Sequence, residues 1–169
     1  MKIVNAAEPH LAGILEIFNT AVRETFAVWT EREDTLNDRR AWMLKCQSNG
    51  FPVIVALDVQ NAVLGYAAYG SFRGKEGYDI TVEHSVYVAN HVQGKGIGKA
   101  LLTELIVRAQ ADSRLERMVA AIDAGNPVSE KLHAALGFEK EGYMRKVAKK
   151  WDQHRDLLIM TKDVSSPNT

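Results

Sequence analysis

The sequence predicts a single-domain α/β protein built on a mixed β-sheet, and three observations lead to this prediction. The chain has 169 residues, a length that one domain with its own core accommodates. Strand-like segments and segments with helical apolar spacing follow one another in the order β-α-α-β-β-β-α-β-α-β-β. No repeat, low-complexity tract or linker divides the chain. We therefore expect one domain over residues 1–164 and a disordered tail over residues 165–169.

Seven segments have the composition and alternation of β-strands. Two of them are joined through Asp58–Asn61 and should form a hairpin, and the charged turn Arg73–Gly77 precedes the next strand. The predicted strands are Lys2–Asn5, Pro52–Leu57, Val63–Ser71, Thr81–Val88, Met118–Ile122, Phe138–Val147 and Leu157–Lys162.

Four segments carry apolar residues at helical spacing, and their ends carry capping residues. Thr35 and Asp38 have the spacing of a capping box at the start of the second helix, which Gly50 should end. Asn126 and Pro127 are typical of the start of a helix. The apolar stripes are Leu11, Ile14, Leu15, Phe18 and Val22; Leu36, Trp42, Met43 and Cys46; Leu101, Leu102, Leu105, Ile106 and Ala109; and Val128, Leu132 and Leu136, before Gly137.

Charge and cysteine content exclude several classes of protein. Lys plus Arg and Asp plus Glu both number 21, so the formal net charge is zero, whereas nucleic-acid-binding proteins usually carry a basic excess. Cys46 is the single cysteine, which excludes an intrachain disulfide and fits a reducing cytoplasm. No apolar run is long enough to cross a bilayer, and the first residues have a strand pattern rather than that of a signal peptide. We therefore expect a cytoplasmic protein with neither a nucleic-acid partner nor a membrane partner.

A glycine-rich segment, Gln93-Gly94-Lys95-Gly96-Ile97-Gly98-Lys99, lies between the fourth strand and the third helix. Glycines let the backbone approach a ligand, and the N–H groups at a helix start favour phosphate. The segment is not a P-loop, because Lys99 stands where the second glycine is required, and it lacks the third glycine of the dinucleotide fingerprint. It predicts a phosphate-binding loop, and the alternative is a glycine-containing turn before an ordinary helix.

Three motifs in order resemble the Gcn5-related N-acetyltransferase (GNAT) superfamily. Gln93, Gly96 and Gly98 fit its pyrophosphate-binding pattern Gln/Arg-x-x-Gly-x-Gly/Ala. A helix that opens with Asn126 and closes in Leu-Gly-Phe at residues 136–138 resembles the helix flanking the cofactor. Thr81–Val88 resembles the Thr-Val-Glu-x-x-Val-Tyr-Val strand of the phosphinothricin and methionine sulfoximine N-acetyltransferases, and the resemblance extends from the first helix to Lys162.

This resemblance implies a mixed sheet with splayed central strands and helices on both faces. It implies acetyl-CoA as co-substrate, the amine of a small amino-acid-like molecule as acceptor, and a homodimer. Metal is not expected, because His10, His91 and His154 lack the spacing of metal ligands. The residues expected to bind the cofactor are Val86, Tyr87, Val88, Gln93, Gly94, Lys95, Gly96, Ile97, Gly98, Lys99, Asn126 and Ser129.

Two residues are candidates for moving protons. Glu83 is the candidate general base, acting directly or through water, because a carboxylate among apolar strand residues should have a raised pKa; alternatively it is a solvated carboxylate at the end of a strand. His133 stands where many superfamily members have a tyrosine, and the phosphinothricin branch also has a histidine at this position. It either protonates the leaving thiolate or is a packing and cofactor-contact residue. His84 faces away from Glu83 and is expected to be structural.

Acceptor binding is expected to involve the Phe72-Arg73-Gly74 turn, Glu83 and the loop that contains Phe26 and Trp29. A guanidinium suits a carboxylate or phosphinate, and aromatic side chains commonly wall such pockets. Arg73 is alternatively an exposed loop cation, and the two aromatics alternatively cover the core.

Other functions fit the same sequence less well. Trp151, His154 and Asp156 echo the branch pattern Lys-x-Gly-x-Trp-x-Asp, but its glycine is missing and His154 stands at its tryptophan position, which leaves the acceptor open. Alternatives are acetylation of another small amine or of a protein N-terminus, or a non-catalytic acyl-CoA sensor. Glu83 argues against the sensor, and the failed P-loop count argues against a phosphotransfer protein.

Overall fold

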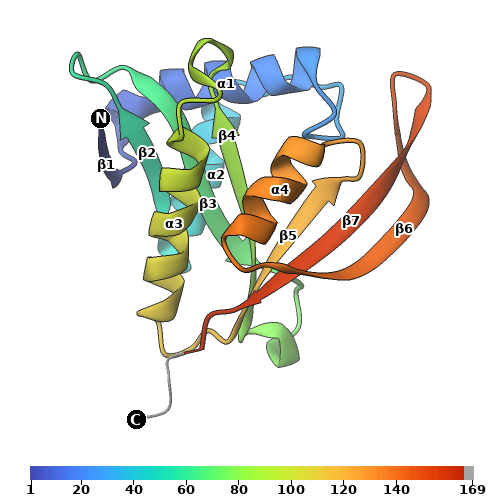
Figure 1. Cartoon of the computed structure of the whole chain (residues 1–169). Coiled ribbons are helices and arrows are strands. Elements are labelled where there is room, and N and C mark those ends of the chain that lie inside the picture. Colours follow the sequence, from blue (N-terminus) through green and yellow to red (C-terminus); the bar gives the residue numbers. More distant parts are fainter. Residues whose placement is uncertain (166–169) are drawn as a thin grey trace.

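The computed structural model describes residues 1–165. The predicted disordered tail therefore lies outside the described residues, apart from Ser165, whose N–H donates to the Asp163 carboxylate. In the described part of the chain all the strands form one seven-stranded sheet in the order β1-β2-β3-β4-β5-β7-β6, and the mixed α/β class is confirmed (Figure 1). The strands are β1 (Lys2–Asn5), β2 (Val53–Leu57), β3 (Val63–Ser71), β4 (Thr81–Val88), β5 (Arg117–Asp123), β6 (Glu139–Lys150) and β7 (Gln153–Asp163).

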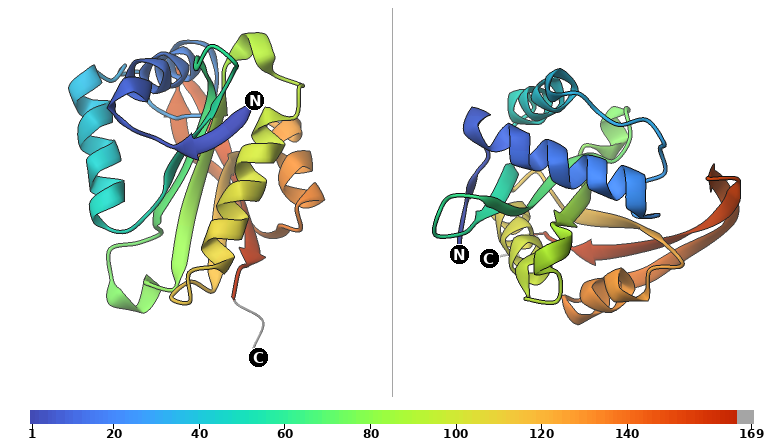
Figure 2. Two further views of the ribbon diagram at one scale, coloured as in Figure 1. Left: turned by 90° about the vertical axis from the view of Figure 1, so that its left-hand side faces the viewer. Right: turned by 90° about the horizontal axis from the view of Figure 1, so that it is seen from above.

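Helices cover both faces of the sheet, as Figure 2 shows from two further directions. α1 and α2 lie on one face, and α3 and α4 lie on the other. The helices are α1 (Leu11–Glu24), α2 (Leu36–Ser48), α3 (Ile97–Gln110) and α4 (Pro127–Ala135), with short 3₁₀ turns at Glu8–His10, Glu76–Tyr78 and Asn90–Val92. The predicted order of elements is confirmed.

Each face of the sheet has its own hydrophobic core. α1 and α2 bury Leu11, Ile14 and Met43 against β2 and β3, and α3 buries Leu101 and Leu105 on the opposite face. This follows from the apolar stripes of the helices, because each stripe must be removed from water against one sheet face. The sheet between the two cores is therefore packed on both faces.

The capping residues act as their spacing predicts. The Thr35 hydroxyl accepts from the Asp38 N–H, and the Asp38 carboxylate accepts from the Thr35 N–H at 2.8 Å. The Asn126 side chain accepts from the Ser129 N–H at 3.0 Å and starts α4. Gly137 follows that helix with a φ of 83°, a conformation that favours glycine.

Two predictions about packing and length were wrong. Val128 was expected in the apolar stripe of α4, but its side chain is 77% exposed, because the first turn of α4 borders a cavity rather than the core. The last two strands were predicted too short. β6 is exposed along nearly its whole length, so its sequence carries many charged residues and little alternation, and the predicted strand stopped at Val147 while β6 runs to Lys150.

The central strands splay apart, as the family resemblance implies. β4 and β5 form the parallel pair of the described sheet, and their pairing runs from Thr81–Arg117 to His84–Ala120. β4 continues to Val88 and remains paired with β3 on its other side. Beyond His84 the edge of β4 that faces β5 therefore has no partner strand within the described chain.

Candidate active site

A cavity of about 740 Å³ opens where β4 leaves β5. On one side it is bordered by α3, α4 and the glycine-rich segment, and on the other by α1 and the loop that follows α1. The cavity therefore passes through the splay of the sheet. A long ligand lying in it would reach both faces.

The glycine-rich segment turns sharply into α3 at one end of this cavity. Gly94 and Gly96 have φ values of 76° and 80°, and Gly96 is the residue that precedes the helix. The N–H groups of the first helical turn, which begins at Ile97, have no acceptor within the helix, and Ile97 and Gly98 border the cavity. This combination of backbone donors and positive helix dipole is suited to a pyrophosphate.

Most of the residues predicted to bind the cofactor come together here. Val86, Tyr87 and Val88 border the cavity from β4, and Lys95 is the one predicted member that does not border it. The others that border it are Gln93, Gly94, Gly96, Ile97, Gly98, Lys99, Asn126 and Ser129.

His133 and His84 form a buried pair beside the cavity, and both border it. The two Nε2 atoms are 3.2 Å apart, and Nδ1 of His133 lies 2.7 Å from the Ser129 carbonyl oxygen. A carbonyl can only accept, so His133 carries its proton on Nδ1. A neutral His133 then accepts at Nε2 from the Nε2–H of His84, which leaves Nδ1 of His84 as an acceptor, buried and without a partner within the described residues.

Burial keeps both imidazoles neutral. Desolvation lowers the pKa of His133, and its hydrogen bond to Ser129 opposes this only partly. Desolvation together with the neighbouring His133 lowers the pKa of His84 to about 3. Near neutral pH, His133 has a single proton, and that proton is already donated to a carbonyl.

Glu83 lies on β4 immediately before the splay. Its side chain is exposed, yet enough protein surrounds the carboxyl that desolvation raises its pKa, against the opposing charge of Arg73. Glu83 does not itself border the cavity, but Ser85 and Tyr87, on the same face of the strand, do. A carboxylate that has a raised pKa and adjoins cavity-lining residues in the strand has the properties of a general base.

The predicted acceptor-binding turn lies at the surface beyond Glu83. Arg73 and Gly74 are exposed, and the Arg73 guanidinium carbon lies 5.0 Å from the centroid of the Phe72 ring. None of these three residues borders the cavity as described. The structure places Arg73 close enough to Glu83 to act on its charge, and its role with substrate stays a prediction.

The loop after α1 borders the cavity through Thr25 and Ala27, not through the two aromatics that sequence reasoning selected. The Phe26 ring packs against Trp151, with centroids 4.9 Å apart, and the Trp29 indole N–H donates to the Asp123 carboxylate at 3.0 Å. The aromatics thus hold the loop against the β5–β7 side of the sheet. We call residues 25–29 the acceptor loop.

Sequence reasoning missed Asp123 at the end of β5. Its carboxylate accepts from the Arg155 Nε and Nη2 at 2.8 and 2.6 Å, from Trp29, and from the Gly125 N–H at 2.8 Å. Desolvation raises the pKa of Asp123, but these hydrogen bonds outweigh it and lower the pKa overall. An aspartate after a buried strand and before Gly125 is the sequence signal that could have been noted.

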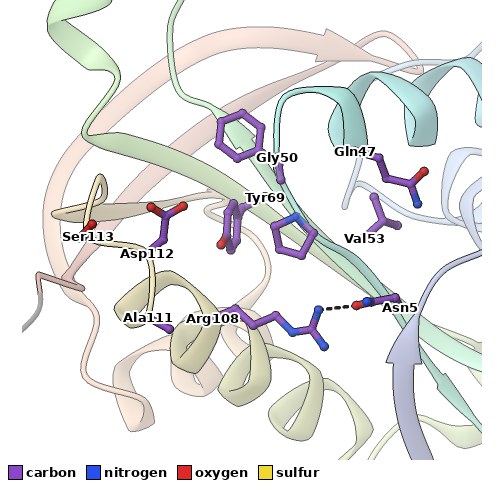
Figure 3. Close-up of a pocket in the computed structure, with 11 residues that line it drawn as sticks. Asn5, Gln47, Gly50, Val53, Tyr69, Arg108, Ala111, Asp112 and Ser113 are labelled. Carbon is purple, nitrogen blue, oxygen red and sulfur yellow. Dashed lines mark hydrogen bonds between the residues drawn. The ribbon is translucent and has the colours of Figure 1, made fainter.

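A second hollow, of about 640 Å³, lies at the C-terminal end of α3 and contains none of the predicted site residues (Figure 3). The Arg108 guanidinium reaches across this hollow and donates to the side-chain oxygen of Asn5. Tyr69 and Asp112 lie on the same side of the hollow as Ser113. Burial and the charge of Asp112 raise the pKa of Tyr69 to about 12. Since it has no connection to the glycine-rich segment or the splay, we assign the chemistry to the larger cavity.

Within residues 1–165 no group of three or more His, Cys, Asp or Glu side chains has an arrangement that could hold a metal ion. Over the same residues no helix combines the length and apolar character needed to cross a membrane.

The chain belongs to the acetyltransferase (GNAT) family, whose family model matches residues 14–138. An L-methionine sulfoximine/L-methionine sulfone acetyltransferase of Pseudomonas paraeruginosa is 47% identical over 159 residues, which cover 94% of this chain and 92% of that protein. The predicted family and branch are confirmed.

Solved structures agree with this assignment. A phosphinothricin acetyltransferase from Sinorhizobium meliloti in complex with acetyl-CoA has a TM-score of 0.94 and 35% identity, over 97% of this chain and 88% of the other. A ribosomal-protein-alanine N-acetyltransferase from Brucella melitensis has a TM-score of 0.93 and 41% identity, over 96% of this chain and 99% of the other. The chain is an acetyl-CoA-dependent N-acetyltransferase, as predicted.

Proposed function

We propose that the enzyme transfers the acetyl group of acetyl-CoA to the amine of a free amino acid analogue. The acceptor would carry a tetrahedral oxidised centre of the sulfoximine, sulfone or phosphinate type. The observation that carries this proposal is the cavity itself, which runs from the glycine-rich segment through the splay to the acceptor loop. The names of the Pseudomonas and Sinorhizobium relatives support the acceptor type.

Residues of β4 would meet two main requirements of the transfer. The unpaired edge of β4 at Val86–Val88 would bind the pantetheine arm, and a backbone N–H there would polarise the thioester carbonyl. Glu83 would take the proton of the acceptor ammonium, directly or through water, so that the neutral amine attacks the thioester. The C–N bond forms and the C–S bond breaks. The proton that the attacking nitrogen loses passes to the departing thiolate, directly or through water, so that coenzyme A leaves as the free thiol.

His133 has a contact role in this proposal rather than the role of an acid. Its one proton is donated to the Ser129 carbonyl, and its other nitrogen accepts from His84. A neutral imidazole in this arrangement has no free proton for a thiolate. Of the two roles open from the sequence, the geometry favours the contact.

The acceptor is tested by a panel of amines with acetyl-CoA, followed by release of free thiol. The panel contains L-methionine sulfoximine, L-methionine sulfone, phosphinothricin, a polyamine and a peptide with N-terminal alanine. We expect the three amino acid analogues to have the highest kcat/KM. The peptide tests a second candidate, acetylation of a protein N-terminus, which the similarity to the Brucella protein favours.

Arg73 is proposed to bind the acceptor carboxylate. A hydrogen bond to a charged group contributes about 1.5–3 kcal/mol, so Arg73→Ala should raise the acceptor KM by roughly ten- to a hundredfold and leave the KM for acetyl-CoA unchanged. Decarboxylated acceptors should lose a similar factor with the wild type and little more with the variant, because both changes delete one contact. If Arg73→Ala still distinguishes acceptors with a carboxylate from decarboxylated acceptors as well as the wild type does, Arg73 does not bind the carboxylate.

A cytoplasmic location and a homodimer also remain proposals. The family resemblance and the single cysteine support them. The middle of β6 exposes Tyr143, Met144 and Val147, which a second copy of the chain would cover. Light scattering on the purified enzyme would show a mass twice that of the chain, and a single-chain mass would reject the dimer.

A further inference from the structure

Lys150 is the last residue of β6, and it is 1% exposed. Lysine is rarely buried to this extent, because removing an ammonium from water is costly unless its donors are satisfied. The tight turn that follows, Trp151-Asp152, has φ values of 48° and 58° and leads directly into β7. Lys150 therefore projects inward from the end of β6 that adjoins the turn of the β6–β7 hairpin.

The ammonium of Lys150 donates to three backbone carbonyls. Nζ lies 2.8 Å from the oxygen of Val22, 2.6 Å from that of Thr25 and 2.9 Å from that of Val28. An ammonium has three N–H donors, so every donor is used. Val22 lies in the last turn of α1, where carbonyls lack helical partners and a positive charge is favourable.

These carbonyls belong to the segment that walls the cavity. Thr25 and Ala27 border it, and the chain from Thr25 to Thr35 has neither helix nor strand to hold its backbone. Lys150 lies more than 120 positions further along the chain, with separations of 128, 125 and 122 residues from its three acceptors. One side chain from the β6–β7 hairpin thus connects the end of α1, at Val22, to two carbonyls of the acceptor loop, those of Thr25 and Val28.

On the basis of the proposed function, we propose that Lys150 is a positioning residue for the acceptor. By holding the carbonyls of Val22, Thr25 and Val28 together, it fixes the acceptor loop in the shape that places the amine against the thioester. It acts through the loop and does not touch the substrate. The cofactor end of the cavity, formed by the glycine-rich segment and α4, does not depend on it.

The chemistry of the site requires lysine in particular. Three carbonyls converge on a single atom, which a tetrahedral ammonium can serve and a planar guanidinium cannot. Methionine has nearly the same shape but no donor, so Lys150→Met leaves three carbonyls without their partner. Lys150→Arg keeps the charge and loses the geometry.

The experiment compares Lys150→Met with Lys149→Met as the matched control. Lys149 is the preceding residue and is exposed, and its ammonium pairs with the exposed Asp152 at 2.7 Å. For Lys150→Met we expect the acceptor KM to rise about tenfold or more, because a displaced loop no longer positions the amine. The KM for acetyl-CoA, and the thermal shift that acetyl-CoA produces, should stay within about twofold of the wild type, and Lys149→Met should match the wild type in both constants.

Four outcomes separate the possibilities. An acceptor KM in folded Lys150→Met equal to that of the wild type overturns the positioning role, as does an equal rise in both KM values, which indicates general loosening of the fold. If Lys150→Met does not fold, Lys150→Arg is measured in its place and must show the same split between the two substrates. If the wild type acetylates no small amine in the panel, the proposed function itself fails, before any Lys150 variant is compared.

Discussion

Replacing Asp123 by asparagine should lower the melting temperature by about 6–12 °C. The Asp123 side chain is 2% exposed and pairs with Arg155, whose side chain is 17% exposed. Asparagine keeps the shape but turns one acceptor oxygen into a donor, so it cannot serve Arg155, Trp29 and Gly125 together.

The magnitude follows from burial. Removing one partner of a buried ion pair costs about 3–5 kcal/mol, and we take the lower end because Arg155 retains some contact with water. In a domain of this size each kcal/mol lost lowers the melting temperature by about 2–4 °C. A loss of about 3 kcal/mol therefore lowers it by about 6–12 °C. The acceptor KM should rise as well, because Trp29 loses its anchor.

The pH dependence provides a second check on the same variant. The folded protein lowers the pKa of Asp123, so its ionised form stabilises the fold above the pKa of the unfolded chain, about 3.9. That contribution is lost as the pH falls through the still lower folded pKa. The difference in melting temperature between wild type and Asp123→Asn should therefore be constant from pH 7 to about pH 5 and shrink below about pH 4.

Thermal melts of Asp123→Asn are compared with those of Asp112→Asn. Asp112 also binds an arginine, at 2.6 Å, but the Arg114 side chain is 60% exposed, so the control should lose less than about 1 kcal/mol. If the two variants melt at the same temperature, burial does not strengthen the Asp123 pair and the reasoning is refuted.

Three further predictions concern catalysis and cofactor binding. Glu83→Gln should lower turnover roughly a hundredfold and leave the affinity for acetyl-CoA unchanged. It should also remove the acidic limb of the plot of kcat/KM against pH, a limb that the raised pKa of Glu83 places above the ordinary carboxyl range. An unaltered pH profile would assign Glu83 another role. His133→Phe should slow turnover less than Glu83→Gln and leave the basic limb where it is, since His133 has no free proton, and loss of that limb would restore the acid role. Gly96→Val should abolish the thermal shift caused by acetyl-CoA, because a φ of 80° strains valine, whereas Gly77→Val, in an open turn, should retain it; a normal shift in Gly96→Val would move the phosphate site elsewhere.

Sequence reasoning succeeded where the determinants are local. The capping box of Thr35 and Asp38 and the cap of α4 at Asn126 are hydrogen bonds between residues three positions apart, and such spacings can be recognised in the sequence. The glycine-rich segment was legible for the same reason. The family resemblance, not periodicity, supplied the splay of β4 from β5.

The contacts that sequence reasoning missed join distant segments. Trp29 donates a hydrogen bond to Asp123, which lies 94 positions further along the sequence. Lys150 donates to carbonyls at and after the end of α1 that lie more than 120 positions before it. A lysine at the end of an exposed strand has the pattern of a solvated residue, and only the folded backbone brings three carbonyls to it. The same limit explains Phe26 and Trp29, which were expected at the cavity and instead anchor the loop behind it.

The splay divides the sheet into two parts with few hydrogen bonds between them. β1–β4 and β5–β7 are each continuous antiparallel ladders, and between the two the described pairing runs only from Thr81–Arg117 to His84–Ala120. A boundary with few cross-strand hydrogen bonds favours partial unfolding there. A ligand in the splay that binds only the native state stabilises it in proportion to the logarithm of its concentration. Bound acetyl-CoA, the substrate of the enzyme, should therefore oppose partial unfolding at this boundary.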